Sequence, residues 1–288
     1  METLRTALKD PLDKWSVPVP LMDRISVIQR TTLTWTLREA AEAFANHGFK
    51  WFGARIDALR ITGLAESRKI LDDCGLSISS IGSSGHFVSP DADDRERRIN
   101  ECFRAIDDAA AVDGNVLVIV AGTDVRCSRE DCFKMIEDGI AQVLPHAEKS
   151  GVVLGLEPLH PMFAADKSIV ITMSQAMDLL DKFSSPYLRV MVDTFHTWWD
   201  PELYNQIRRA RGRICGFHVN DWVTMQFGIS NSRGMIGDGM IPLRKIRSSI
   251  EEAGYFGPID IEIFNEDFWH LPCEQLLCTC IERYKQYV

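Results

Sequence analysis

Short apolar runs alternate with longer amphipathic stretches along most of the chain. The apolar runs are too short for helices and several end at a polar residue, which predicts buried strands of a parallel sheet. The amphipathic stretches repeat apolar residues three and four positions apart, which predicts helices that cover that sheet. The predicted strands are 25–29, 50–55, 76–82, 115–121, 152–157, 188–193, 213–218 and 258–262. The predicted helices are 36–45, 64–74, 93–111, 128–149, 174–183, 201–211, 242–253 and 273–284.

Eight strand-then-helix units in about 260 residues indicate a (β/α)₈ barrel, an α/β fold in which helices surround a closed parallel sheet. We expect one catalytic domain over residues 23–288. Residues 1–22 contain three prolines and no clear periodicity, which predicts an N-terminal arm. A doubly wound sheet is the alternative, but no G-x-G-x-x-G motif follows the first strand.

Four successive predicted strands end in a residue that binds metals: Glu157, Asp193, His218 and Glu262. Each residue alone is more often a helix cap or an ion-pair partner. Barrel closure would bring all four to the rim where barrel enzymes have their active sites. Clustered carboxylates are costly unless a cation neutralises them. Three carboxylates and one imidazole predict one divalent metal ion, Mn²⁺ first, with Mg²⁺, Co²⁺ or Zn²⁺ as alternatives.

Three further polar residues follow strands at the same rim. His196 lies three residues after Asp193 and is either a site residue or a buried core histidine. Arg233 begins a glycine-rich loop that would place it over the metal, or else leave it solvated at a surface turn. His86 follows the third predicted strand and would contact a substrate.

Aromatic residues and two acids after the rim strands have more ordinary interpretations as well. Asp221 and Asp238 would bind a second metal or, as we favour, serve as turn residues. The aromatic residues would form an apolar wall of the pocket, in which Trp269 contacts substrate, although each one alone more often packs. They are Trp198, Trp199, Trp222, Phe268 and Trp269.

Composition narrows the class of protein and its partners. The formal net charge of −9 disfavours nucleic acid as a partner. No apolar run is long enough to span a membrane and the N-terminus lacks a signal-peptide pattern, so we expect a cytoplasmic protein. The eight cysteines form no C-x-x-C pair, which suits reduced thiols. A zinc clip at Cys278 and Cys280 is disfavoured because residues two apart in a helix point to different sides.

The motifs around the four candidate ligands resemble those of the xylose-isomerase-like sugar isomerase/epimerase barrels. They are Gly-Leu-Glu157-Pro, Val-Asp193-Thr-Phe-His196, Phe-His218-Val-Asn-Asp221, Gly-Asp-Gly239-Met-Ile-Pro-Leu and Ile-Glu262-Ile-Phe. The C-terminal half is most similar to keto-inositol isomerases and ketose 3-epimerases. The first half matches only in its strand–helix rhythm. The segment 222–232 and the N-terminal arm depart from the pattern and would reshape the pocket or meet another subunit.

The resemblance implies that the four residues bind one metal ion, that Glu157 and Glu262 are the acid/base pair, and that His196 and Arg233 contact substrate. It implies a metal-dependent isomerase or epimerase of a sugar-like or keto-inositol substrate. Such an enzyme removes the proton α to a carbonyl and stabilises an enediolate with its metal. We expect a homo-oligomer, dimer or tetramer.

Three alternatives to isomerisation stay open. A lyase of the same fold would eliminate a β substituent, as a dehydratase or a 3-keto-glycoside cleaving enzyme. An apurinic endonuclease shares several motifs, but residues 222–240 contain no histidine to complete its further zinc ligands. A catalytically silent barrel is disfavoured by the intact ligand set.

Overall fold

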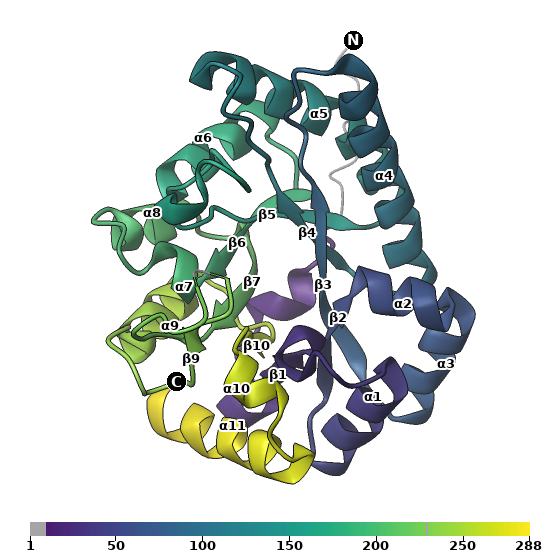
Figure 1. The fold of residues 1–288 in the computed structure, drawn as a ribbon, viewed down its shortest axis with the longest axis vertical. Coiled ribbons are helices and arrows are strands. Elements are labelled where there is room, and N and C mark those ends of the chain that lie inside the picture. Colours follow the sequence, from purple (N-terminus) through teal and green to yellow (C-terminus); the bar gives the residue numbers. More distant parts are fainter. Residues whose placement is uncertain (1–9, 229) are drawn as a thin grey trace.

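The computed structural model describes residues 10–228 and 230–288 of the chain. Its centre is a closed barrel of eight parallel strands, in which the last strand pairs with the first (Figure 1). The predicted (β/α)₈ barrel is therefore confirmed, and the doubly wound sheet is wrong. The barrel strands are β1 (Ile25–Ile28), β2 (Trp51–Arg55), β3 (Ser77–Gly85), β4 (Val116–Val120), β5 (Val153–Leu156), β6 (Leu188–Asp193), β7 (Ile214–Val219) and β10 (Ile259–Ile261).

Eight helices, one after each barrel strand, surround the barrel (Figure 1), and their buried apolar residues belong to the core. Capping side chains mark where some of these helices begin. Thr36 and Glu39 form a capping box at the start of the first helix. The helices are α1 (Leu37–Asn46), α3 (Leu64–Asp73), α4 (Ala92–Ala111), α5 (Arg129–Ser150), α6 (Met173–Phe183), α8 (Leu203–Arg209), α9 (Leu243–Glu252) and α11 (Cys273–Tyr287).

Several short elements were not predicted, because each is too short to show a period in the sequence. The most important is a two-stranded antiparallel hairpin outside the barrel, β8 (Asp221–Trp222) with β9 (Arg233–Gly234). The others are α2 (Ile56–Thr62), α7 (Thr194–Thr197), α10 (Glu266–Trp269) and the 3₁₀ turns η1 (Asp13–Ser16), η2 (Leu21–Asp23), η3 (Gln29–Thr32) and η4 (Pro161–Phe163).

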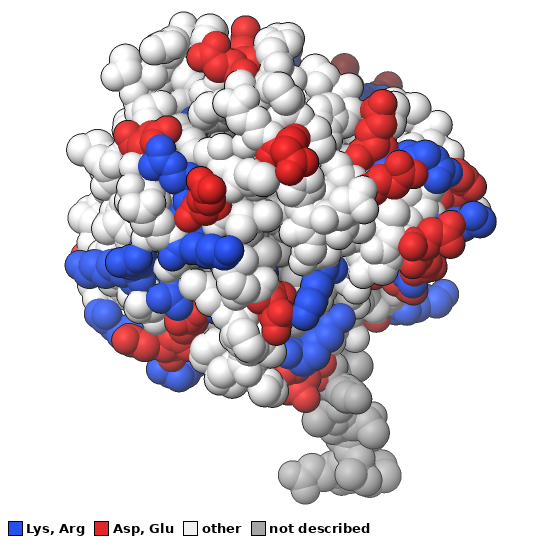
Figure 2. Space-filling view, turned by 90° about the horizontal axis from the view of Figure 1, so that it is seen from below, with Lys and Arg blue, Asp and Glu red and all other residues white. Residues whose placement is uncertain are grey.

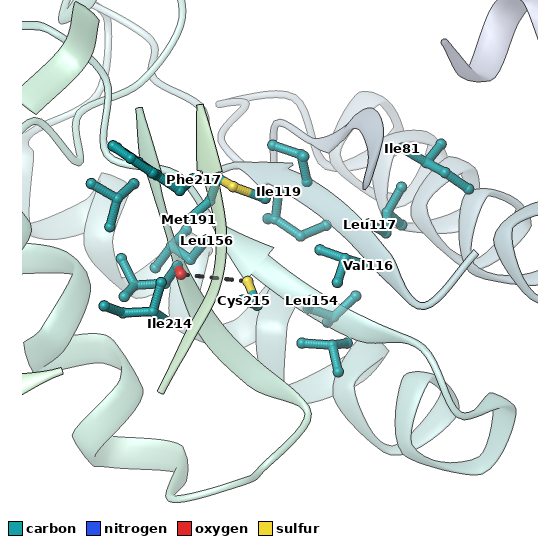
Figure 3. Packing of buried hydrophobic residues seen from close by; sticks show 14 of the residues in the cluster. Ile81, Val116, Leu117, Ile119, Leu154, Leu156, Met191, Ile214, Cys215 and Phe217 are labelled. Carbon is teal, nitrogen blue, oxygen red and sulfur yellow. Dashed lines mark hydrogen bonds between the residues drawn. The ribbon is translucent and has the colours of Figure 1, made fainter. Parts of the chain in front are cut away.

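The core lies inside the barrel and between its strands and the helices (Figure 3). All five residues of β4 are buried, as expected for a strand covered on both faces. Inside the barrel, Met191 fills space that two glycines leave open. A Cβ at Gly216 would lie 2.3 Å from its sulfur, and one at Gly155 would lie 2.8 Å from Sγ of Cys215 and 3.6 Å from the terminal methyl of Met191. The interior is therefore a packed core up to the rim that carries the site.

The segment before β1 packs at the N-terminal end of the barrel. Trp15 is buried and meets Trp51 and Tyr255 edge to face, with ring centroids 6.2 and 6.0 Å apart. The Trp15 carbonyl accepts a hydrogen bond from the Phe256 amide at 2.7 Å, and Asp10 pairs with buried Arg189. The first nine residues of the expected arm lie outside the described residues. Among the described residues, no helix has the length and apolarity needed to cross a membrane.

Candidate metal centre and active site

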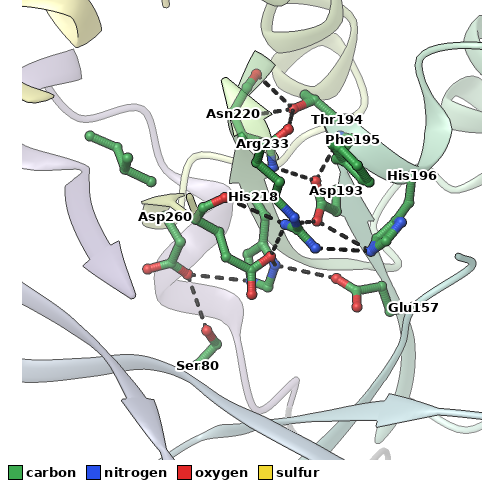
Figure 4. Close-up of polar contacts among 12 residues, drawn as sticks. Ser80, Glu157, Asp193, Thr194, Phe195, His196, His218, Asn220, Arg233 and Asp260 are labelled. Carbon is green, nitrogen blue, oxygen red and sulfur yellow. Dashed lines mark hydrogen bonds and ion pairs between the residues drawn. The ribbon is translucent and has the colours of Figure 1, made fainter. Parts of the chain in front are cut away.

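The four side chains expected at the rim lie together in the structure, and Figure 4 labels Glu157, Asp193 and His218 among them. One ligand atom from each of Glu157, Asp193, His218 and Glu262 lies within 4.8 Å of every other. Asp193 is the last residue of β6 and His218 is the second-last residue of β7. Glu157 and Glu262 directly follow β5 and β10. These strands are successive neighbours in the barrel, so closure of the sheet creates the cluster.

The donor atoms of this cluster fit a divalent cation. Nδ1 of His218 lies 3.3 Å from Oε1 of Glu157 and 3.4 Å from Oε2 of Glu262. Both ring nitrogens of His218 and Oε1 of Glu157 are buried without a hydrogen-bond partner among the described residues. Buried polar atoms are rarely left unpaired, because each unpaired atom costs about 1–3 kcal/mol. A cation bound by three carboxylates and one imidazole would satisfy Nδ1 of His218 and Oε1 of Glu157, whereas Nε2 of His218 faces Asp260.

Asp193 is oriented by two hydrogen bonds that hold one of its oxygens. Oδ1 accepts from the Phe195 amide at 2.8 Å and from the Asn220 side-chain amide at 2.9 Å. This leaves Oδ2 directed at the cluster. Asn220 was not predicted as a site residue. Its sequence signal was its place between His218 and Asp221, directly after a rim strand.

Arg233 is buried over the cluster and is not a solvated turn residue. Its Nη1 lies 2.8 Å from Oδ2 of Asp193 and 2.6 Å from Oε2 of Glu262. The guanidinium lies between two aromatic rings, with centroids 4.7 Å away at Phe195 and 4.2 Å away at Phe264. The β8–β9 hairpin places Arg233 there through its pairing with Trp222. The arginine thus holds two of the four candidate ligands in place.

Burial and mutual charge shift the pKa values of the cluster in opposite directions. Burial raises the pKa of Glu262, but Arg233 and His218 outweigh it and hold this pKa well below its usual range. Burial raises the pKa of Asp193 to about 7, opposed by Arg233 and supported by Glu262 and Glu157. Burial lowers the pKa of His218, but Glu262 and Glu157 outweigh it and raise this pKa well above the usual value. A metal must therefore displace protons to bind.

His196 lies beside the cluster as a neutral histidine. Its Nδ1 accepts a hydrogen bond from the His160 amide at 3.1 Å, and Nε2 lies 3.2 Å from Nη2 of Arg233. Burial, with a further contribution from Arg233, lowers the pKa of His196 well below its usual value. His160, which was not predicted, stacks on Trp222 with centroids 4.7 Å apart. Its only sequence signal is its position three residues after Glu157.

Asp260 is an acidic residue near the cluster that was not predicted. It lies on β10, two residues before Glu262. Its oxygens accept hydrogen bonds from the hydroxyls of Ser79 at 2.6 Å and Ser80 at 3.1 Å. Its Oδ2 lies 3.7 Å from Nε2 of His218, on the other edge of the ring from Glu157 (Figure 4). Burial raises the pKa of Asp260, opposed by His218 and the serine hydroxyls. The signal was the two-residue spacing, because alternate strand residues share a face.

The cluster forms part of the wall of a cavity of about 420 Å³ at the C-terminal end of the barrel. Its apolar walls include Leu159, Phe163 and Phe264, and His86 faces it as expected. Its charged lining residues are Arg30, Arg55, Asp57, Glu157, Lys167, Arg233 and Glu262.

The predicted aromatic wall lies elsewhere. None of its five residues is among those that line the cavity, within the described chain. Trp198 and Trp222 pack on each other, with centroids 5.5 Å apart, and Phe195 packs on Trp222. The Trp269 indole N–H donates to the Arg30 carbonyl at 2.9 Å. A substrate contact of Trp269 stays a prediction that this geometry does not support.

Asp221 is a buried residue of strand β8 and not the turn residue that we favoured, whereas Asp238 is exposed in the loop after β9. Asp221 accepts hydrogen bonds from the amides of Trp222, Gly237 and Ile241. Asp238 pairs with Arg283 at 2.8 Å. Their carboxylates are thus already engaged by the protein.

A second group of potential ligands lies on the surface where α1 meets α11. It consists of His47, Glu274 and Cys278. Nε2 of His47 lies 3.3 Å from Glu274, so the pair joins the first and last helices. Cys280 is buried on another side of α11, away from this group, and all eight cysteines are free thiols.

Fold and site together define a barrel with a candidate divalent-metal centre at its C-terminal rim. Residues 40–278 match the model of the xylose isomerase-like TIM barrel family. The chain belongs to this family, which confirms the resemblance seen in its motifs.

Three curated relatives are enzymes. The 3-dehydroshikimate dehydratase of Pseudomonas putida is 27% identical over 86% of this chain and 39% of that protein. The L-ribulose-5-phosphate 3-epimerase UlaE of Shigella flexneri serotype 5b is 23% identical over 74% of this chain and 73% of the epimerase. The inosose isomerase of Bacillus subtilis is 23% identical over 57% of this chain and 59% of the isomerase. The chain thus spans less than two thirds of the dehydratase and of the isomerase.

Two solved structures have the same fold. Protein SMc04130 of Sinorhizobium meliloti 1021 is 37% identical, with a TM-score of 0.89 over 92% of this chain and 98% of that chain. The IOLI protein, solved with a zinc atom, has a TM-score of 0.79 at 19% identity, over 92% of this chain and 99% of that chain.

Proposed function

We propose that the protein is a divalent-metal-dependent isomerase or epimerase of a sugar-like or keto-inositol substrate. One observation carries this proposal: Glu157 and Glu262 reach one cavity from strands that are three positions apart in the barrel, and each lies within 3.4 Å of Nδ1 of His218. Two carboxylates that face one ligand from separate strands suit removal and return of a proton. The curated relatives that isomerise or epimerise sugars and inosose support this class.

Glu157, Asp193, His218 and Glu262 would hold the metal, and we propose Mn²⁺ because oxygen donors dominate the set. When bound, the metal supplies Lewis-acid stabilisation of negative charge on the substrate oxygens. Mg²⁺, Co²⁺ and Zn²⁺ are the alternatives.

Glu157 and Glu262 would each carry out one part of the proton transfer. Glu157 would bind the metal through Oε1, so its other carboxylate oxygen would accept the proton next to the substrate carbonyl. Glu262 is oriented by Arg233 and is ionised at rest, so it would first take up a proton from solvent and then return it to the neighbouring carbon or to the opposite face. Return to the neighbouring carbon gives isomerisation, and return to the opposite face gives epimerisation. Neutral His196 and charged Arg233 would hold substrate oxygens.

Solvent deuterium incorporation tests this proposal. The metal-loaded protein is incubated in D₂O with a panel of ketoses and keto-inositols, and the carbon next to the carbonyl is examined by NMR. We expect exchange with at least one compound, and we expect Glu157→Gln to slow it by about 10²-fold or more. Glu252→Gln, an exposed site on α9, is the matched control. Absence of exchange throughout the panel, or full exchange by Glu157→Gln, contradicts the proposal.

Elimination is the second candidate. The match to the Pseudomonas putida dehydratase extends over 86% of this chain, more than the match to the epimerase. The same proton removal by Glu157 would then expel a hydroxyl group from the next carbon as water. A product lighter by one water molecule identifies this reaction, whereas isomerisation conserves mass.

We also propose that the substrate is a small molecule and not a nucleic acid. The net charge of −9 supports this, as does the interspersion of acidic and basic side chains on the face drawn in Figure 2. Cleavage of abasic duplex DNA would contradict it. A homo-oligomer stays a proposal, which light scattering in solution can test.

A further inference from the structure

Two of the cations that line the site cavity have no acidic partner. Arg55 pairs with Asp57, and Arg233 pairs with Asp193 and Glu262. Arg30 and Lys167 take part in no ion pair among the described residues, although both line the same cavity. The cavity thus contains two positive charges that form no direct ion pair within the described part of the chain.

Arg30 is held in place by aromatic packing and by its backbone. It lies in η3, directly after β1, and its carbonyl accepts the hydrogen bond from the Trp269 indole. Its guanidinium carbon lies 4.6 Å from the centroid of Phe264, and that of Arg233 lies 4.2 Å from the same ring. The two guanidinium groups therefore cannot be further apart than the sum of these distances. One sugar-sized molecule can therefore contact Arg30 with one end and Glu262 with the other.

Lys167 approaches the cavity from the segment after β5. Its Nζ lies 3.1 Å from the hydroxyl of Ser230 and 4.3 Å from the centroid of Phe163. Phe163 in turn meets His196 edge to face, at 5.6 Å between centroids. Through Phe163, Lys167 therefore lies near His196, in the wall of the same cavity as Arg30.

The two cations repel each other and their neighbours. Burial lowers the pKa of Lys167, Asp166 opposes this shift, and the charges of Arg233 and Arg30 add to it. Burial also lowers the pKa of Arg30, opposed by Glu262 and Asp57 and supported by Arg55 and Arg233. Partly desolvated charges without partners are unfavourable, and a bound anion would offset this cost.

We propose that the substrate carries an anionic group, a carboxylate or a phosphate ester, which binds between Arg30 and Lys167 while its carbonyl end lies at Glu157 and Glu262. This inference rests on the proposed function for the position of the carbonyl end. A neutral sugar would leave both cations unpaired. A cavity of about 420 Å³ accommodates a sugar-sized molecule with one such group.

Calorimetric titration of the Mg²⁺-loaded protein with matched pairs of probes tests the inference. D-fructose is compared with D-fructose 6-phosphate, and D-glucose with D-glucuronate, so that the two pairs distinguish a phosphate from a carboxylate preference. We expect the anionic member of at least one pair to bind about tenfold more tightly or better, the factor expected for a hydrogen bond between charged groups. This advantage should decrease as salt concentration rises.

Variants locate the binding. Arg30→Gln and Lys167→Gln should each reduce the affinity for the preferred anion by about tenfold, with affinity for the neutral probe unchanged. Arg30→Lys should retain part of the affinity. Arg211→Gln and Lys149→Gln, at exposed positions before β7 and β5, are matched controls at the opposite end of the barrel and should have no effect. Metal titration of each variant confirms that its site is intact.

Three results would overturn the inference: equal affinity for both members of each pair, unchanged anion affinity in both Gln variants, or no binding of either anionic probe. Deuterium exchange is measured separately. Anion binding that depends on Arg30 and Lys167, without any deuterium exchange, would refute the proposed reaction but not the anion site. Deuterium exchange without a preference for the anionic probes would refute the anion site but not the proposed reaction.

Discussion

Oδ2 of Asp260 lies 3.7 Å from Nε2 of His218, whereas Nδ1 of the same ring faces Glu157 and Glu262. The imidazole is thus placed between one carboxylate below and the candidate ligands above. A carboxylate behind a metal-binding histidine fixes the orientation of the ring and increases its basicity. Asp260 is a positioning residue in this arrangement.

Asp260→Asn should weaken metal binding by about 10- to 100-fold, the usual effect of removing such a partner. The amide retains the shape and one acceptor oxygen for Ser79 and Ser80, so the fold should persist. Competition titration with a chelating dye measures the affinity directly. Asp238→Asn, a surface carboxylate paired with Arg283, is the control. Equal metal affinities of the two variants would show that Asp260 has no part in the site.

Arg233→Gln should destabilise the metal-free protein more than the metal-loaded one. The change leaves the buried carboxylates of Asp193 and Glu262 without their cation, and breaking a buried ion pair costs about 3–5 kcal/mol. A bound metal would compensate those charges. The free energy of unfolding in urea, measured with and without Mn²⁺, tests this expectation. A loss of the same size in both conditions would mean that arginine and metal do not act on the same carboxylates.

Metal affinity should rise with pH through the neutral range. In the metal-free protein Glu262 and Glu157 raise the pKa of His218, and burial raises the pKa of Asp193 to about 7. Both groups must lose their protons to become ligands, so protons compete with the metal as pH falls below these raised pKa values. Calorimetric titrations in buffers of different ionisation enthalpy would report the proton release. Affinity that is flat from pH 5.5 to 8, with no protons released, is inconsistent with this arrangement.

Trp15→Ala should destabilise the protein by about 3–5 kcal/mol, the usual cost of truncating a buried tryptophan. The indole is 4% exposed and packs on Trp51 and Tyr255 at the end of the barrel remote from the site. Trp15→Phe should cost less, because the apolar contact largely remains. Thermal unfolding of both variants measures the effect. A loss below about 1 kcal/mol for Trp15→Ala would show that the segment contributes little to the barrel.

The barrel and its four rim residues could be predicted because two regularities act together. Apolar runs reveal buried strands, and parallel strands present their C-terminal ends at one rim, so the residues that end them must meet. The alternation that places Asp260 and Glu262 on one face was also present in the sequence. Asp260 was missed because it lies within the apolar run and not at its end.

The remaining parts of the site depend on side-chain directions that loop sequences do not determine. Arg233 is placed by a hairpin whose strands contain two residues each, too short for any periodic signal. Trp269 follows a rim strand, as expected, but its indole turns to the backbone of Arg30 and away from the cavity. His160 and Asn220 each reach one site residue from a loop, His196 and Asp193 respectively. Position after a strand predicts the neighbourhood of a residue but not the atom it contacts.

The central claim is that Glu157, Asp193, His218 and Glu262 bind one divalent cation together. The most direct measurement is the metal content of the purified protein after loading and dialysis, compared with four variants: Glu157→Gln, Asp193→Asn, His218→Gln and Glu262→Gln. We expect one metal ion per chain in the unaltered protein and a marked loss in every folded variant. No bound metal in the unaltered protein, or full retention in all four variants, would contradict it.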